Sequence, residues 1–144
     1  MKTEYRREQN STDTANRIQP NSVYIANINA VSFVKEEDKD ECRFVFNLSF
    51  ASLNNKEVKR SILPLGADLD FVLSTILKAN PDYDADELFA DAHDDAENNP
   101  EALCSWLASE LVGHQMQIKT KPNPKSPQFV YLNFDKLIKA ESKE

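Results

Sequence analysis

The sequence predicts a mainly β fold with a helical insertion (β+α), because the period of its apolar residues changes twice along the chain. Apolar and polar residues alternate between about residues 23 and 62, and again between 115 and 120, as in half-buried strands, and residues 129–134 form a short run that is apolar on both faces. Between these regions the apolar residues recur every three to four positions, as in amphipathic helices. With 144 residues, 40% hydrophobic and 28% charged, the chain suits one globular domain.

Three strands are expected in the first half of the chain. The first runs from Val23 to Val34, and its apolar phase slips near Asn29–Ala30, which indicates a bulge. A charged hairpin loop follows at 35–41. The second strand has the clearest alternation, with one face formed by Cys42, Phe44, Phe46, Leu48 and Phe50.

The third strand follows a turn at Asn54–Asn55, since asparagine tolerates positive φ. It places Val58 and Ile62 on one face and Lys59 and Ser61 on the other. Pro64 ends it, because proline cannot donate to a strand ladder.

The middle of the chain predicts helices. One buried stripe consists of Leu69, Val72, Leu73, Ile76 and Leu77, with Asp68 as the expected N-cap and Pro81 as the stop. The acidic stretch 82–97 is expected to hold a short helix. A further helix begins at Asn99 with Pro100 in its first turn, and Gly113 ends it.

The chain then returns to strands. Met116, Ile118 and Thr120 share one face of a strand, the proline-rich segment 121–127 forms a loop, and a short strand covers 129–134. This order fits a five-stranded OB-like barrel over residues 22–138, with a helical insertion at 67–113 between strands three and four. An unrelated α+β sheet with a helical cap is the alternative. Residues 1–21 are expected to form a flexible arm and 139–144 to fray.

Composition argues against several function classes. Two glycines are too few for a phosphate-binding loop, a nucleophile elbow or a dinucleotide fingerprint. His93 and His114, with Cys42 and Cys104, fit no zinc spacing and no catalytic constellation, and residues 82–93 fail as an EF-hand. We therefore expect a non-enzymatic protein without cofactor or metal, and cytoplasmic, because no membrane span or secretion signal is evident.

Charge is unevenly distributed. Residues 81–101 contain nine acids and no lysine or arginine, so removing them from the net charge of −7 leaves +2 for the remainder. A basic working face is therefore compatible with the composition. The candidates for nucleic-acid contact are the cations and polar-tipped aromatics expected on outward strand positions or in loops: Arg43, Lys56, Lys59, Arg60, Lys119, Lys121, Lys125, Tyr24 and Tyr131.

Three stretches resemble phage and prophage single-stranded-DNA-binding-like proteins with an OB-fold core. Residues 23–33 with 41–50 are similar to their opening hairpin, residues 61–77 to their third strand and helix, and residues 110–134 to their final two strands. The resemblance implies non-catalytic handling of single strands in phage or mobile-element replication and recombination.

Two functions follow from the sequence. The first is binding of single-stranded DNA. The alternative is a protein-binding module, such as a phage-encoded inhibitor or assembly factor, that contacts a basic partner through Asp91, Asp94 and Asp95 in the acidic segment 82–101. Trp106 and the phenylalanines of the second strand are expected in the core. The oligomeric state is left open.

Overall fold

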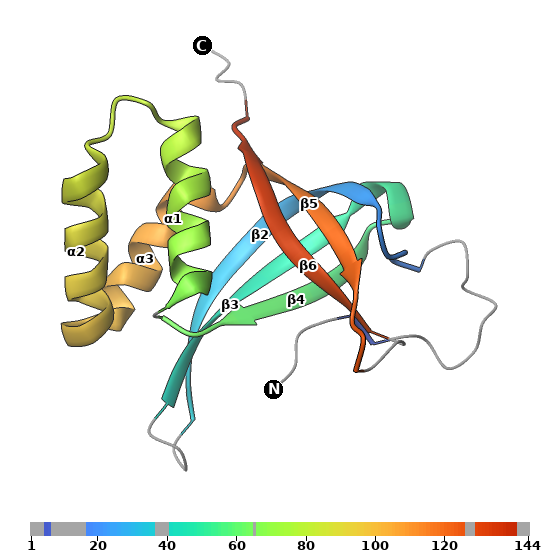
Figure 1. The fold of residues 1–144 in the computed structure, drawn as a ribbon, viewed down its shortest axis with the longest axis horizontal. Helices are drawn as coiled ribbons and strands as arrows, with labels where there is room; N and C mark the ends of the chain where they lie inside the picture. The colour runs from blue at the N-terminus through green and yellow to red at the C-terminus, as the bar shows by residue number, and fades with distance from the viewer. Residues whose placement is uncertain (1–4, 7–16, 37–40, 65, 126–128, 141–144) are drawn as a thin grey trace.

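The computed structural model describes residues 5–6, 17–36, 41–64, 66–125 and 129–140. Its strands are β1 (Tyr5–Arg6), β2 (Val23–Glu36), β3 (Glu41–Phe50), β4 (Lys56–Ile62), β5 (Gln115–Pro122) and β6 (Phe129–Ile138). Its helices are α1 (Ala67–Ala79), α2 (Ala85–Asn98) and α3 (Pro100–Leu111), all between β4 and β5 (Figure 1). The mixed architecture and the place of the helical insertion are as the sequence predicts.

The strands form one antiparallel sheet in the order β1-β6-β5-β2-β3-β4. The sheet is not closed into a barrel, so the expectation of a five-stranded barrel is wrong on closure. In place of a strand ladder, a side chain bridges the two edges, because Arg60 Nε on β4 donates to the Leu132 carbonyl of β6 at 3.2 Å. The outer edge of β6 pairs instead with β1, where Tyr5 lies opposite Val130.

A bulge in β2 lets this strand serve both halves of the sheet. The register of β2 with β3 shifts between Ile28 and Ala30, at the predicted position. Beyond the bulge Val31 and Phe33 lie opposite Phe46 and Phe44, so they face the same side as Ile28. One strand therefore pairs with β5 through residues 23–27 and with β3 through residues 27–36.

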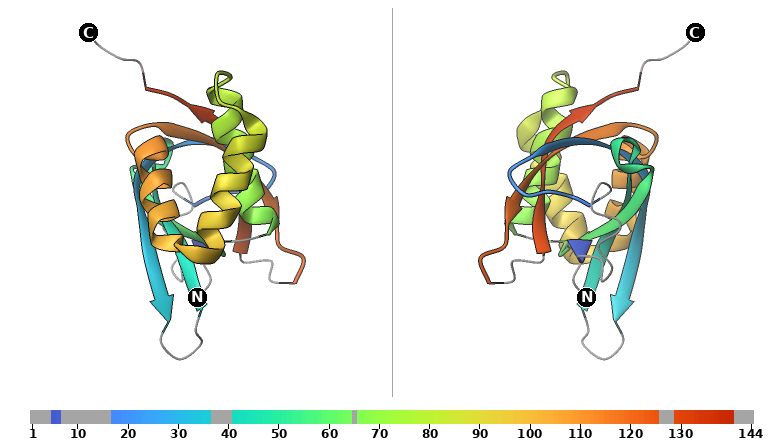
Figure 2. Two further views of the ribbon diagram at one scale, coloured as in Figure 1. Left: turned by 90° about the vertical axis from the view of Figure 1, so that its left-hand side faces the viewer. Right: turned by 90° about the vertical axis from the view of Figure 1, so that its right-hand side faces the viewer.

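The core lies between the sheet and the helices. The predicted alternation of β3 is confirmed, since Phe44, Phe46, Leu48 and Phe50 are fully buried. The helices gather at one end of the strands (Figures 1 and 2) and contribute their own buried residues to the same cluster: Leu69, Val72, Leu73, Ile76, Leu103, Leu107 and Leu111. The insertion is therefore not an appendage, because an open sheet needs a second layer to cover its apolar face.

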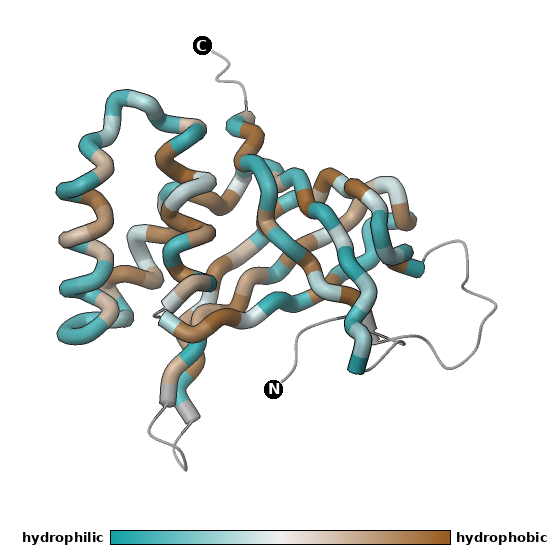
Figure 3. Tube along the Cα trace, in the orientation of Figure 1, coloured by the Kyte–Doolittle hydropathy of each residue, from teal (hydrophilic) through white to brown (hydrophobic). Residues whose placement is uncertain are grey.

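Local signals were mostly confirmed. Asn54 and Asn55 have φ of 61° and 60°, and Gly113 has φ of 92° just past α3. The N-cap of α1 is Gly66 rather than Asp68, which lies in the first turn. Hydrophilic and hydrophobic residues alternate along the turns of α1 and α2 (Figure 3).

The chain ends contain more structure than the sequence predicts. β6 continues to Ile138, four residues past the predicted strand, and Leu137 is buried. Within 1–21, Tyr5–Arg6 forms β1 and Ile18 is 3% exposed; 1–4 and 7–16, like most of the 35–41 loop and 141–144, lie outside the described residues. In the described part of the chain, every helix is too short or too polar to cross a membrane.

Candidate functional site

The cations of β3 and β4 do not form one track. Cross-strand register places Lys56 opposite Phe50 and Arg60 opposite Phe46, so both lie on the face that carries the core, not outward as predicted. Arg43 and Lys59 lie on the opposite face, where Lys59 is exposed and pairs with Asn47. Arg60 is also held in place, since its Nη1 donates to the Ser61 carbonyl at 2.8 Å.

The outer face of β5 and β6 does bring predicted residues together. Lys119 lies opposite Asn133 and Lys121 lies opposite Tyr131, and all four side chains are exposed. Lys125 is exposed in the connector between these strands. Lys119 Nζ is 3.7 Å from Asp135 Oδ1 with both side chains partly in solvent, so this ion pair holds the ammonium only weakly.

An aromatic residue on α1 extends this surface. Phe71 is 64% exposed, the most exposed large apolar side chain in the described part of the chain. It lines, together with Asn133, a shallow hollow of about 100 Å³ between α1, β4 and β6, and Asp68 contributes one carboxylate there. We define the aromatic–basic track as Lys119, Lys121, Tyr131, Asn133 and Phe71.

Tyr24 is not available as a stacking platform. Its ring is half-buried and meets Phe50 edge to face at a centroid distance of 5.6 Å. Its hydroxyl accepts the Gln19 backbone N–H at 2.9 Å. The side chain is therefore committed to the core and to the segment before β2.

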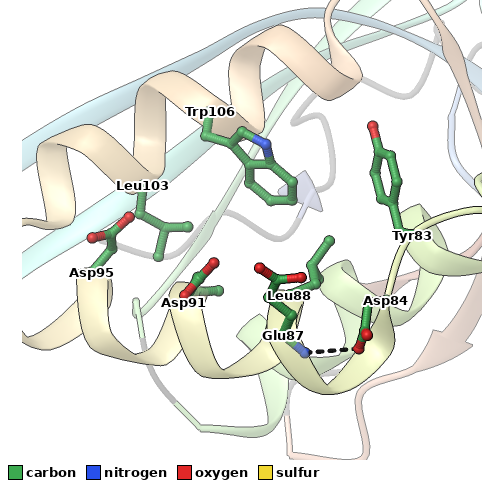
Figure 4. Close-up of a pocket in the computed structure, with 9 residues that line it drawn as sticks. Tyr83, Asp84, Glu87, Leu88, Asp91, Asp95, Leu103 and Trp106 are labelled. Carbon is green, nitrogen blue, oxygen red and sulfur yellow. Dashed lines mark hydrogen bonds between the residues drawn. The ribbon is translucent and has the colours of Figure 1, made fainter.

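A second surface is a cleft of about 500 Å³ between α2 and α3 (Figure 4). Its floor is apolar and is formed by Leu88, Ala92, Leu103 and Trp106. Its rim carries Asp84, Glu87, Asp91 and Asp95, with Tyr83 at one end. We call this the acidic cleft.

The predicted acidic contacts are divided by the helix geometry. Glu87, Asp91 and Asp95 are spaced four residues apart, so they form one ridge of α2 along the cleft. Asp94 does not line it and instead accepts a hydrogen bond from Asn98 Nδ2 at 2.9 Å. Only Asp91 and Asp95 of the three predicted residues therefore share a site.

Two local interactions order the ends of the cleft. Asp84 caps α2 by accepting the Glu87 backbone N–H at 3.1 Å. The Tyr83 hydroxyl donates to the Glu110 carboxylate of α3 at 3.0 Å, which ties the segment before α2 to α3. Partial burial and this carboxylate raise the pKa of Tyr83 above its ordinary value, because both disfavour a negative charge on the phenol.

The histidines and cysteines have structural contacts. His93 Nε2 is 2.8 Å from Asp70 Oδ1, which links α2 to α1, and His114 Nδ1 accepts the Ala140 backbone N–H at 2.8 Å. Cys42 and Cys104 are unpaired thiols. Within the described ranges, no three potential metal-ligating side chains come together.

No protein-family model matches the chain, and no curated protein sequence matches it.

Phe71, Asn133 and Trp106 are among the residues of these surfaces that the sequence did not predict as site residues. Phe71 falls off the apolar stripe of α1, which is itself a signal of exposure. Asn133 and the cleft-lining position of Trp106 leave no such signal, because a short apolar strand and an apolar helical stripe read as core.

Proposed function

We propose that this protein binds single-stranded DNA without catalysis, along the aromatic–basic track. The observation that carries the proposal is that Tyr131 and Asn133 are exposed on one face of β6 opposite two lysines of β5, and that Asn133 shares a hollow with the exposed Phe71 of α1. Single-strand sites combine stacking platforms with cations that follow the phosphates.

Each group has a distinct role in this proposal. Tyr131 and Phe71 stack bases, which is tolerant of sequence because every base has a π-face. Lys119 and Lys121 neutralise phosphates, and Lys125 does so from the connector. The Asn133 amide lies two residues from Tyr131 on β6 and lines the same hollow as Phe71, and it offers both a donor and an acceptor to a base edge.

The strand order supports a finer proposal for the fold. Without the short β1, the spatial order of the strands is β6-β5-β2-β3-β4, and the helices lie between β4 and β5 in the chain. This arrangement matches an OB fold that is open between its third and fifth strands, which correspond to β4 and β6. OB folds are partly open barrels whose loops, including the one between the last two strands, contact oligonucleotides. The resemblance of residues 23–33, 41–50 and 110–134 to phage single-stranded-DNA-binding-like proteins supports a role in replication or recombination.

Fluorescence anisotropy with a labelled oligo-dT tests the stacking component. Tyr131→Ala and Phe71→Ala should each weaken binding by about 5- to 150-fold, since one base–aromatic stack is worth about 1–3 kcal/mol. Tyr83→Ala is the matched control, because Tyr83 has similar exposure (38% against 45% for Tyr131) but lies at the acidic cleft. Equal losses in all three variants would remove the proposed site.

Salt dependence tests the electrostatic component. Lys119→Gln with Lys121→Gln should reduce the slope of log K against log salt by about 1.4, because each phosphate contact to a single strand contributes about 0.7. Absence of binding by the unmodified protein at about 50 µM and low salt would overturn the function itself, since even non-specific binding is typically tighter than about 100 µM.

A further inference from the structure

The acidic cleft is a hollow with apolar walls on both of its helices. Leu88 and Ala92 come from α2, and Leu103 and the half-buried Trp106 come from α3 (Figure 4). The Trp106 ring extends from α3 toward Tyr83 and Leu88. An apolar floor with a few polar groups at its edge is the usual composition of a binding site.

The rim is negative on one side only. Glu87, Asp91 and Asp95 repeat every four residues along α2, and like charges at this spacing repel one another. Among the described residues that line the cleft there is no lysine or arginine to offset them. The charge therefore stays uncompensated where the surface is hollow, and a cationic ligand would relieve the repulsion.

We propose that the acidic cleft binds a basic amphipathic helix from a partner protein. The apolar face of that helix, with a leucine-sized anchor, packs over Leu88, Leu103 and Trp106. Its lysines or arginines, spaced four residues apart, match the ridge of Glu87, Asp91 and Asp95, because equal helical rise gives equal spacing of about 6 Å on both helices.

The shape of the cleft favours this occupant over a small cation. The described residues contain no cluster of three metal-ligating groups, and the apolar floor has no side chain that would coordinate an ion. A helix laid between two helices uses both parts of the site, the floor for anchoring and the rim for orientation. This proposal does not depend on DNA binding, which uses other residues.

Trp106 makes the cleft directly observable, since it is the only tryptophan in the chain. The probe is a synthetic peptide of about 14 residues, made of leucine and lysine in an amphipathic helical pattern. Binding should shift the Trp106 emission to the blue as the indole loses water. A peptide with the same leucines and glutamate in place of lysine should leave the emission unchanged.

A matched pair of variants separates this site from general charge attraction. Asp91→Asn with Asp95→Asn should weaken the lysine peptide about tenfold. Asp94→Asn with Glu97→Gln changes the net charge of the same helix equally, but both residues lie outside the cleft lining, so affinity should change less than twofold. Equal losses in both double variants would overturn the proposal, as would an unshifted Trp106 at saturating peptide.

Leu88→Ala tests the apolar anchor, and Leu88 is half-buried, so the variant is expected to fold. It should weaken peptide binding about fivefold while the circular dichroism spectrum is retained.

Two other occupants of the cleft would give different results in the absence of peptide. A blue shift that grows with protein concentration would assign the cleft to a second copy of the chain. A blue-shifted emission that persists on dilution would assign it to a segment of the same chain.

Discussion

The aromatic–basic track and the acidic cleft carry opposite charges, but they differ more in what supports them. Apart from Phe71 of α1, the track consists of side chains that stand on the outer face of β5 and β6, where Lys121 and Tyr131 are exposed. The cleft floor belongs to the core, since Leu103 is 1% exposed and still lines the hollow. The strand residues of the track project from a sheet that packs without them, whereas the cleft is formed where α2 and α3 do not pack fully against each other.

This difference has an energetic consequence. Side chains on a strand exterior can be exchanged at little cost to folding, whereas a cleft floor shared with the core couples binding to stability. α2 itself is held by little apolar burial, because its buried residues are the small side chains Ala92 and Ala96. The α3 side of the cleft is therefore well anchored in the core, whereas α2 is expected to separate from the core at a lower free-energy cost.

The largest contrast should appear in stability. Leu103→Ala is expected to lower the free energy of unfolding by about 2–5 kcal/mol, because it removes a buried side chain and leaves a cavity. Tyr131→Ala should change the free energy of unfolding by less than about 1 kcal/mol. Urea unfolding of both variants measures the contrast. Similar losses would mean that the track is as much a part of the core as the cleft floor.

A smaller contrast is expected between the labelling rates of the two cysteines. Cys104 lies on the side of α3 that packs on β2, and Cys42 lies in β3. Cys104 is 4% exposed and its Sγ lies 3.8 Å from the Val31 carbonyl. Burial, and then Glu101, raise the pKa of Cys104, so its reactive thiolate fraction at pH 8 is below that of an ordinary cysteine and grows only at more alkaline pH. Thiol labelling should modify Cys42 at least about tenfold faster, a difference of about 1.4 kcal/mol. Equal rates would show that α3 leaves the sheet readily.

The smallest expected effect concerns the charge ridge. Asp91→Asn should stabilise the protein by about 0.4–1 kcal/mol, because Asp91 lies four residues from both Glu87 and Asp95 and each such pair costs about 0.2–0.5 kcal/mol. Lys121→Gln on the track should give a smaller change. Thermal unfolding at low and high salt measures both, and the gain for Asp91→Asn should shrink as salt screens the repulsion. A gain that is independent of salt would contradict this origin.

The strands and helices were largely readable from the sequence because each local signal agreed with the packing. The alternation through Phe44, Phe46 and Leu48 and the bulge near Ala30 both correspond to buried positions and register. Closure was not readable. Whether β4 pairs with β6 depends on what occupies their edges, and here the Arg60 side chain and β1 do so.

The candidate sites were predicted less well, because residue type does not report orientation. Lys56 and Arg60 are cations in an alternating strand, yet their phase places them on the core face opposite Phe50 and Phe46. Lys121 and Tyr131 were predicted individually, but their pairing depends on the register of β5 with β6. Asp94 was grouped with Asp91 and Asp95 because they are near in sequence, although Asp94 does not line the cleft and accepts a hydrogen bond from Asn98 instead.

The pairing of β2 with β5 has a consequence for synthesis on the ribosome. Residues 23–26 of β2 receive their strand neighbour only after all three helices have been made, since Tyr24 lies opposite Ile118 of β5 and pairing with β3 begins at Asn27. During that interval the nascent chain carries an unpaired strand edge beside the completed β2–β3–β4 meander, a state open to mispairing with another chain. The acidic helix α2, which is made during this interval, gives the growing chain charge while that edge is still unpaired.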